Sequence, residues 1–176
     1  MNLTRLKRLT EAAEGRVGHF YLDTAGHVTV GIGHLVATID DAIKLRLEPA
    51  AAICADFRRV SQAEPGLVAE AYAHLCESRM ADQDIEELLD RDMQAVLDQI
   101  PTKFPKFHTW PDGPQEATFD MAYNVGIGFG RKFPHLALAL QLGDWRAAAA
   151  QCHRLPPISD ERNQRTAALY LSGVQA

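Results

Sequence analysis

Apolar side chains recur at helical spacing at the start of the chain, and Gly15 follows them as a helix stop. The pattern predicts a short amphipathic helix over residues 3–14. Its apolar face consists of Leu3, Leu6, Leu9 and Ala13.

The apolar period changes to two between residues 20 and 33. Val28, Val30 and Ile32 alternate with polar or small residues, and β-prone runs flank the stretch "DTAG". A three-residue loop at 24–26 that ends in glycine is typical of a hairpin with a bulge. We therefore expect a β-hairpin in this region.

After His34 the pattern is helical to the end of the chain. Helix-forming stretches at 39–60 and 65–80 are interrupted near Pro49 and at Pro65-Gly66, and a long amphipathic helix ends at Pro101. The fold class is therefore α+β, a small β-hairpin lobe beside a mainly helical body. Later helices are expected to open at Pro114 and to be capped by Asp144 and Ser159.

Composition limits the classes of function. The net charge is −5, and no run of Lys and Arg exceeds two residues, which argues against a nucleic-acid or anionic-membrane surface. Cys54, Cys76 and Cys152 are odd in number and widely spaced, so we expect reduced core residues. No signal peptide and no apolar stretch of about 18 residues is present, which predicts synthesis in the cytoplasm without a membrane span.

The stretch "EGRVGHFYLDTAGHVTVGIGH", residues 14–34, carries the candidate chemistry. Glu14 lies in the last turn of the first helix, at the margin of its apolar stripe. Partial burial and the negative end of the helix dipole both disfavour a charged carboxylate, which suits a general acid. The alternative is an ordinary solvated glutamate at a helix end.

Asp23 and Thr29 fall on one face of the predicted hairpin. Asp23 pairs with His27 across the loop, and Thr29 lies two residues further along. A carboxylate and a hydroxyl on one face can hold a water between them, although Asp23 can also be a turn residue that bonds its own backbone. Cleavage of a glycosidic bond requires one protonated carboxyl and one ionised carboxylate, which Glu14 and Asp23 could supply.

Two other signals are weaker. His19, His27 and His34 have no HxxxH spacing and no Cys partner, so we expect no metal. The glycine-rich stretches "GIGFG" and "GIGH" fit neither phosphate-binding pattern, so we expect no nucleotide and no cofactor.

The same stretch resembles the phage-type lysozymes of glycoside hydrolase family 24. It keeps "EG", "Y.D..G..T.GIGH" and the spacing Glu-x8-Asp-x5-Thr, while "DIEELLDRDMQAVLDQI", "MAYNVG" and "SDERNQRTAALY" resemble later helices of the family. The resemblance implies one lysozyme-like domain over residues 1–176, with a long helix that joins two lobes. The hairpin lobe would span 15–83 and the helical lobe 84–176, with helix 1–14 packing on the latter.

The resemblance also implies roles for individual residues. Glu14 would be the general acid, Asp23 the carboxylate that activates water, and Thr29 a residue that places this water, in an inverting reaction. Arg162 would pair with Glu14, and His34 would be a supporting member of the hairpin lobe. The residues that would line the sugar cleft are Leu35, Tyr123 and Asn124.

The implied activity is a monomeric muramidase that cleaves the β-1,4 bond between N-acetylmuramic acid and N-acetylglucosamine in peptidoglycan. It would serve as a phage endolysin released by a holin, or as a toxin effector secreted into a target cell and matched by an immunity protein. The negative charge and a longer segment at 37–82 than the family suggests favour the effector. The alternatives are a lytic transglycosylase and a non-catalytic peptidoglycan-binding module.

Overall fold

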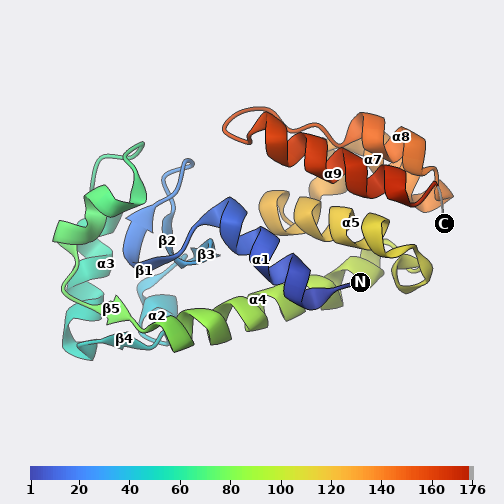
Figure 1. Ribbon diagram of the computed structural model, residues 1–176. Helices are drawn as coiled ribbons and strands as arrows, with labels where there is room; N and C mark the ends of the chain where they lie inside the picture. Colours follow the sequence, from blue (N-terminus) through green and yellow to red (C-terminus); the bar gives the residue numbers. More distant parts are fainter. Residues whose placement is uncertain (175–176) are drawn as a thin grey trace. The chain divides into compact units, whose positions relative to one another are not determined.

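The computed structural model of the protein describes residues 1–174, which are mainly helical with a small antiparallel sheet (Figure 1). The predicted α+β class is confirmed. Residues 9–92 form one compact unit, and residues 1–8 with 93–174 form another. Helices α1 (Leu3–Glu14) and α4 (Asp82–Lys103) contribute residues to both units. The single domain with a lobe boundary at 83–84 stays a prediction.

Three short strands form the sheet of unit 9–92. They follow the order β1 (Val17–Leu22), β2 (Val28–Gly31) and β3 (His34–Leu35), and each pairs antiparallel with the next. Tyr21 lies opposite Thr29, and Thr29 in turn lies opposite Leu35. The predicted hairpin is present, but β3 was not expected, because two residues are too few for an apolar period to appear in the sequence.

The two faces of this sheet have different surroundings. Phe20 and Leu22 of β1 share one face with Val28 and Val30 of β2, and all four are buried. Helix α3 (Ile53–Ser61) packs on this face. The rings of Phe57 and Phe20 contact each other edge to face, with 6.1 Å between their centroids. The other face carries Tyr21 and Thr29, which places the candidate chemistry on the side of the sheet away from α3.

The segment between β3 and α4 is only partly helical. The expected helix at 65–80 is wrong, because a 3-10 helix and a short strand stand there instead. Asp56 of α3 explains the difference: its buried carboxylate accepts the backbone amides of Glu77 and Ser78, which therefore cannot close helical turns. The remaining elements are α2 (Ile39–Ala42), β4 (Leu47–Glu48), η1 (Ala50–Ala52), η2 (Ala69–Leu75) and β5 (Arg79–Met80).

The 3-10 helix η2 lies along the outer edge of β1. His19 Nε2 of β1 donates to the carbonyl of Ala69 at 3.0 Å, and Cys76 Sγ donates to the carbonyl of Phe20 at 3.5 Å. The loop before η2 and the β1–β2 turn stand next to each other in Figure 1. A Cβ built on Gly26 in that turn would lie 3.8 Å from Cβ of Pro65 in the loop. The segment thus covers an edge of the sheet that its own strands leave open.

Helix α4 does not end at Pro101, contrary to the expectation from the sequence. It continues to Lys103, and the amide of Phe104 still closes onto the carbonyl of Ile100 at 2.9 Å. Proline removes only its own backbone donor, so a helix can complete a final turn around it.

The core of the second unit lies between α5 (Asp112–Val125) and α9 (Asp160–Ser172), which pack side by side (Figure 1). The start of α5 meets the end of α9 so closely that a Cβ on Gly113 would lie 1.9 Å from Oγ of Ser172. Helix α5 begins at Asp112, two residues before Pro114, the expected start. The other helices are η3 (Phe107–Thr109), α6 (Phe129–Lys132), α7 (Pro134–Leu142) and α8 (Trp145–Gln151).

Both predicted helix caps are confirmed. Asp144 accepts the amide of Ala147 at the start of α8, and Ser159 accepts the amide of Arg162 at the start of α9. Cys54, Cys76 and Cys152 are free thiols, and Cys76 and Cys152 are buried as expected, whereas Cys54 is only partly buried. Within residues 1–174, no helix combines the length and apolarity that crossing a bilayer requires.

Candidate active site

Glu14 is the last residue of α1 and is half-buried. Gly15 ends the helix with φ of +77° and donates its amide to the carbonyl of Glu11. Glu14 then lies against the backbone of Gly33, where an added Cβ would stand 3.4 Å from Cγ and 3.5 Å from Oε2 of the glutamate. Glu14 and residue 33 are therefore at van der Waals contact distance, and the φ of +74° at this position is what favours glycine.

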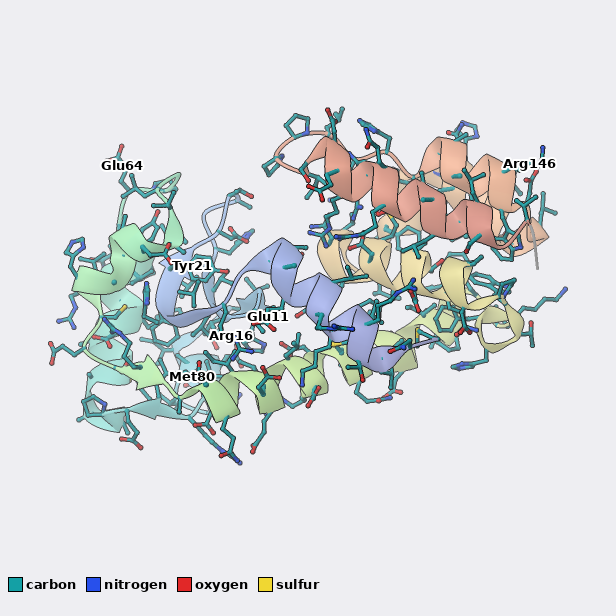
Figure 2. The ribbon with its side chains drawn as sticks, in the orientation of Figure 1. Glu11, Arg16, Tyr21, Glu64, Met80 and Arg146 are labelled. Carbon is teal, nitrogen blue, oxygen red and sulfur yellow. The ribbon has the colours of Figure 1, made fainter. Side chains whose placement is uncertain are left out.

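Arg16 fixes the end of α1 to the start of α4. Its Nε donates to Glu11 Oε1 at 2.7 Å, and its guanidinium also pairs with Glu86 (Figure 2). Hydrogen bonds from these two carboxylates raise the pKa of Arg16, so it stays charged. The helix end that carries Glu14 is thus held by an ion-pair network rather than left to fray.

Asp23 stands at the first position of the β1–β2 turn, where its Oδ1 accepts the amides of Ala25 and His27 at 2.9 and 2.8 Å. This is the turn-residue alternative of the sequence analysis, and it is present. The other oxygen, Oδ2, lies 3.5 Å from Nδ1 of His27, and the side chain is 36% exposed. Because one oxygen fixes the turn, the second is held in a defined direction.

Thr29 is buried, and its hydroxyl donates to the carbonyl of His27 at 3.2 Å. The amide of Asp23 also donates to that carbonyl, so Asp23 and His27 close the hairpin two residues before the Tyr21–Thr29 pair. With a side-chain period of two, Asp23, Tyr21 and Thr29 share one face of the sheet.

Tyr21 is the residue that both acids influence. Burial, together with the smaller effect of the negative charges of Glu14 and Asp23, raises the pKa of its phenol to about 12. Electrostatic effects of this kind require nearby charges. The helix end and the turn therefore both bring a carboxylate close enough to Tyr21 for its charge to act on the phenol, within residues 9–92.

The other predicted residues of this unit are His34 and Leu35 in β3. His34 Nδ1 lies 2.7 Å from Asp92 Oδ2, and both side chains are about three-quarters buried, with exposures of 22% and 23%. This hydrogen bond ties β3 to the middle of α4. Leu35 is 53% exposed and extends from the strand beside Thr29.

Three predicted residues belong to the second unit. Tyr123 and Asn124 lie in the last turn of α5, where the Tyr123 ring packs 5.5 Å from Phe119 and Asn124 Oδ1 accepts Arg154 Nη1 at 3.4 Å. Arg162, in the first turn of α9, donates Nε and Nη2 to Oδ1 of Asp120 at 3.0 and 2.8 Å. Its pairing with Glu14 stays a prediction.

Asp120 is the centre of a buried polar network. Burial raises its pKa, but the guanidinium groups of Arg162 and Arg154 outweigh this effect, so the net shift is downward. Oδ2 of Asp120 also accepts Arg154 Nη2 and the Thr166 hydroxyl, both at 2.8 Å. The carboxylate is thus ionised, and it holds two arginines in place.

Comparison with known families decides the assignment. The family model described as phage lysozyme matches residues 11–165, which include Glu14, Asp23 and Thr29. A search of the curated proteins finds no match.

The chain belongs to the phage lysozyme family.

Members of this family are glycoside hydrolases, so this lysozyme is a muramidase that degrades peptidoglycan and acts on the bacterial cell wall. The sequence did not reveal three residues that contact the predicted site residues or their partners. Asp92 bonds His34, Asp120 bonds Arg162, and Arg154 bonds the same Asp120. Each lies far along the chain from the residue it contacts, and local patterns hold no signal for such pairs. Tyr21 is part of the motif, but the sequence pattern alone indicates no role for it.

Proposed function

We propose that the lysozyme hydrolyses the β-1,4 bond between N-acetylmuramic acid and N-acetylglucosamine by an inverting mechanism. Glu14 is the general acid that protonates the leaving oxygen. Asp23 is the general base that activates a water on the opposite side of the sugar, and Thr29 helps to hold that water. Inverting enzymes separate their carboxyls by about 6.5–9.5 Å to leave room for it.

A single observation supports this proposal. Asp23, Tyr21 and Thr29 share a sheet face, and the negative charges of both Glu14 and Asp23 raise the pKa of the Tyr21 phenol. Two carboxylates near one buried group can supply the acid and the base that cleavage of a glycosidic bond requires. The turn also supports the role of Asp23, because Oδ1 is occupied by backbone amides and Oδ2 is directed away from them.

The remaining residues would bind substrate or support the acids. Leu35, Tyr123 and Asn124 would line the sugar cleft. His34 would hold the hairpin lobe through its pair with Asp92. Arg162 would pair with Glu14, with its guanidinium oriented by Asp120.

We further propose that the lysozyme is monomeric and serves either as a phage endolysin that a holin releases or as a toxin effector delivered into rival bacteria. The negative charge of the chain and the segment between β3 and α4 favour the effector, with an immunity protein as its partner. The holin route needs no secretion signal in the lysozyme itself.

The test is digestion of purified peptidoglycan by the wild type and by Glu14→Gln, with the soluble fragments identified by mass spectrometry. Fragments that end in reducing N-acetylmuramic acid, absent with the variant, would support the muramidase and Glu14 as its acid. Anhydro ends would assign a lytic transglycosylase instead. Binding to the polymer without fragments from either protein would leave a binding module.

The anomeric configuration of the first product distinguishes inversion from retention. We expect NMR spectra taken early in the digestion to show the α-anomer before mutarotation, because water attacks from the face opposite the leaving group. Asp23→Asn should remove this signal along with activity. A β-anomer formed first would exclude the proposed role of Asp23 as a general base.

A further inference from the structure

Tyr21 differs from the other two fully or nearly fully buried tyrosines in how its hydroxyl is satisfied. The Tyr72 hydroxyl donates to the carbonyl of Glu64 at 2.8 Å, and the Tyr170 hydroxyl lies 3.2 Å from Oγ1 of Thr118. Tyr21 is only 9% exposed, yet none of residues 1–174 forms a hydrogen bond with its hydroxyl. Buried tyrosines usually find a partner, so this one needs an explanation.

The unpaired hydroxyl is not sealed inside the protein. In the part of the chain that the structure describes, every side-chain nitrogen and oxygen atom that is buried from solvent has a hydrogen-bond partner. An oxygen without a partner must therefore be exposed to solvent. The Tyr21 ring is therefore packed into the sheet while its hydroxyl reaches the surface. A rigid ring with an open polar end is well suited to bind a ligand, because little side-chain entropy is lost on binding.

The position of the hydroxyl indicates the ligand. Tyr21 lies on β1 (Figure 2). The pairing of the strands places it on the same sheet face as Asp23 and Thr29. Glu14 and Asp23 both act on the phenol electrostatically, but neither carboxylate is hydrogen-bonded to it. Because the phenol is close enough to both acids to respond to their charges, a sugar on which both acids act would lie near its hydroxyl.

The chemistry of the phenol fits a donor. Burial and the two negative charges raise its pKa to about 12, so it keeps its proton at any pH at which a cell wall is degraded. Sugar hydroxyls and acetamido carbonyls are neutral acceptors, and a neutral donor binds them without the desolvation that a charged side chain requires.

We propose that the Tyr21 hydroxyl donates a hydrogen bond to an oxygen of the N-acetylated sugar whose bond is cleaved. Tyr21 is then a catalytic residue in contact with substrate, additional to Glu14, Asp23 and Thr29. The inference rests on the proposed function, since it takes the two carboxylates to flank the reacting sugar.

The experiment compares Tyr21→Phe with the wild type on soluble glycan fragments of purified peptidoglycan. The substitution keeps the buried ring and removes only the hydroxyl, so we expect an unchanged thermal midpoint. The value of kcat/KM should fall by roughly 10- to 100-fold, the effect of losing a donor that acts on the reacting sugar. Wild-type kcat/KM in Tyr21→Phe would overturn the proposal.

Tyr72→Phe is the matched control. It makes the same chemical change at a buried tyrosine of the same unit, whose hydroxyl bonds the carbonyl of Glu64. We expect a lower thermal midpoint and wild-type kcat/KM. A fall in kcat/KM equal to that of Tyr21→Phe would show that loss of a hydroxyl from any buried tyrosine reduces activity. The proposed contact between the Tyr21 hydroxyl and the sugar would then be wrong.

A binding measurement separates contact with the sugar from a general loss of activity. In the background of Glu14→Gln, addition of Tyr21→Phe should weaken binding of the same glycan fragments by about tenfold, measured by calorimetry. Equal binding by the two proteins would exclude the hydrogen bond to the sugar. This arm needs no turnover, so its result stands apart from the digestion test of the proposed function.

Discussion

Replacement of Asp120 by Asn is expected to destabilise the lysozyme strongly. The carboxylate is the anionic partner of two arginines whose side chains are 3% and 8% exposed, and it is itself 14% exposed. Removing one partner of a buried pair leaves an uncompensated buried charge, at a cost of about 3–5 kcal/mol. Asn keeps one acceptor oxygen in place, so we expect about 3 kcal/mol at pH 7.

The assay is urea unfolding monitored by circular dichroism, with the midpoint and the slope recorded for each protein. Asp41→Asn is the control, because it removes the same charge from an exposed pair with Lys44. We expect its midpoint to stay close to that of the wild type, since exposed ion pairs contribute little. A loss below about 1 kcal/mol in Asp120→Asn would refute the reasoning that the carboxylate compensates both arginines.

The pH dependence follows from the direction of the pKa shift. The folded-state pKa of Asp120 is depressed by Arg162 and Arg154, so its stabilisation is present above the unfolded-state pKa, about 3.9, and is lost as the pH falls through the folded value. The difference in stability between wild type and Asp120→Asn should therefore narrow below about pH 4. A constant difference from pH 7 to pH 3 would contradict this assignment.

Three further predictions follow from contacts within residues 9–92. His34→Asn should lower the free energy of unfolding by about 2 kcal/mol, because it removes a charge-assisted bond to Asp92; Asp92→Asn should match it in thermal denaturation. Gly33→Ala should lower the thermal midpoint, since φ is +74° and an L side chain rarely adopts this conformation. It should leave lytic activity of the folded protein largely intact, because the new Cβ would meet Glu14 at ordinary van der Waals distance; parallel melting and turbidity assays will test this. Asp56→Asn should expose the amides of Glu77 and Ser78 to faster hydrogen exchange, and unchanged protection would show that these amides have other partners.

The parts of the site that could be predicted from the sequence are those that are local. The helix stop at Gly15 and the glycine-containing turn after Asp23 are short-range signals, and together they position Glu14 and Asp23. The register of the hairpin follows from the loop length, which is why Asp23 and Thr29 could be assigned to one face.

The parts that could not be predicted depend on contacts between distant residues. Asp92 lies 58 positions from His34, and Asp120 lies 42 positions from Arg162. The 3-10 helix η2 and strand β5 were missed because Asp56, from another element, takes the amides that an α-helix would use. When a distant side chain accepts backbone amides in this way, the segment that contains these amides shows no sign of it in its own pattern of apolar residues.

The packing of η2 along the edge of β1 has a consequence for the behaviour of the lysozyme in concentrated solution. An open strand edge is a template for pairing with another chain, and a sheet of three short strands has few other means to protect it. Here η2 lies along that edge, the side chain of His19 is bonded to Ala69 of η2, and the carbonyl of Phe20 accepts from Cys76 directly after it. The segment between β3 and α4 therefore protects the strand that carries Tyr21 against intermolecular β-sheet formation and aggregation.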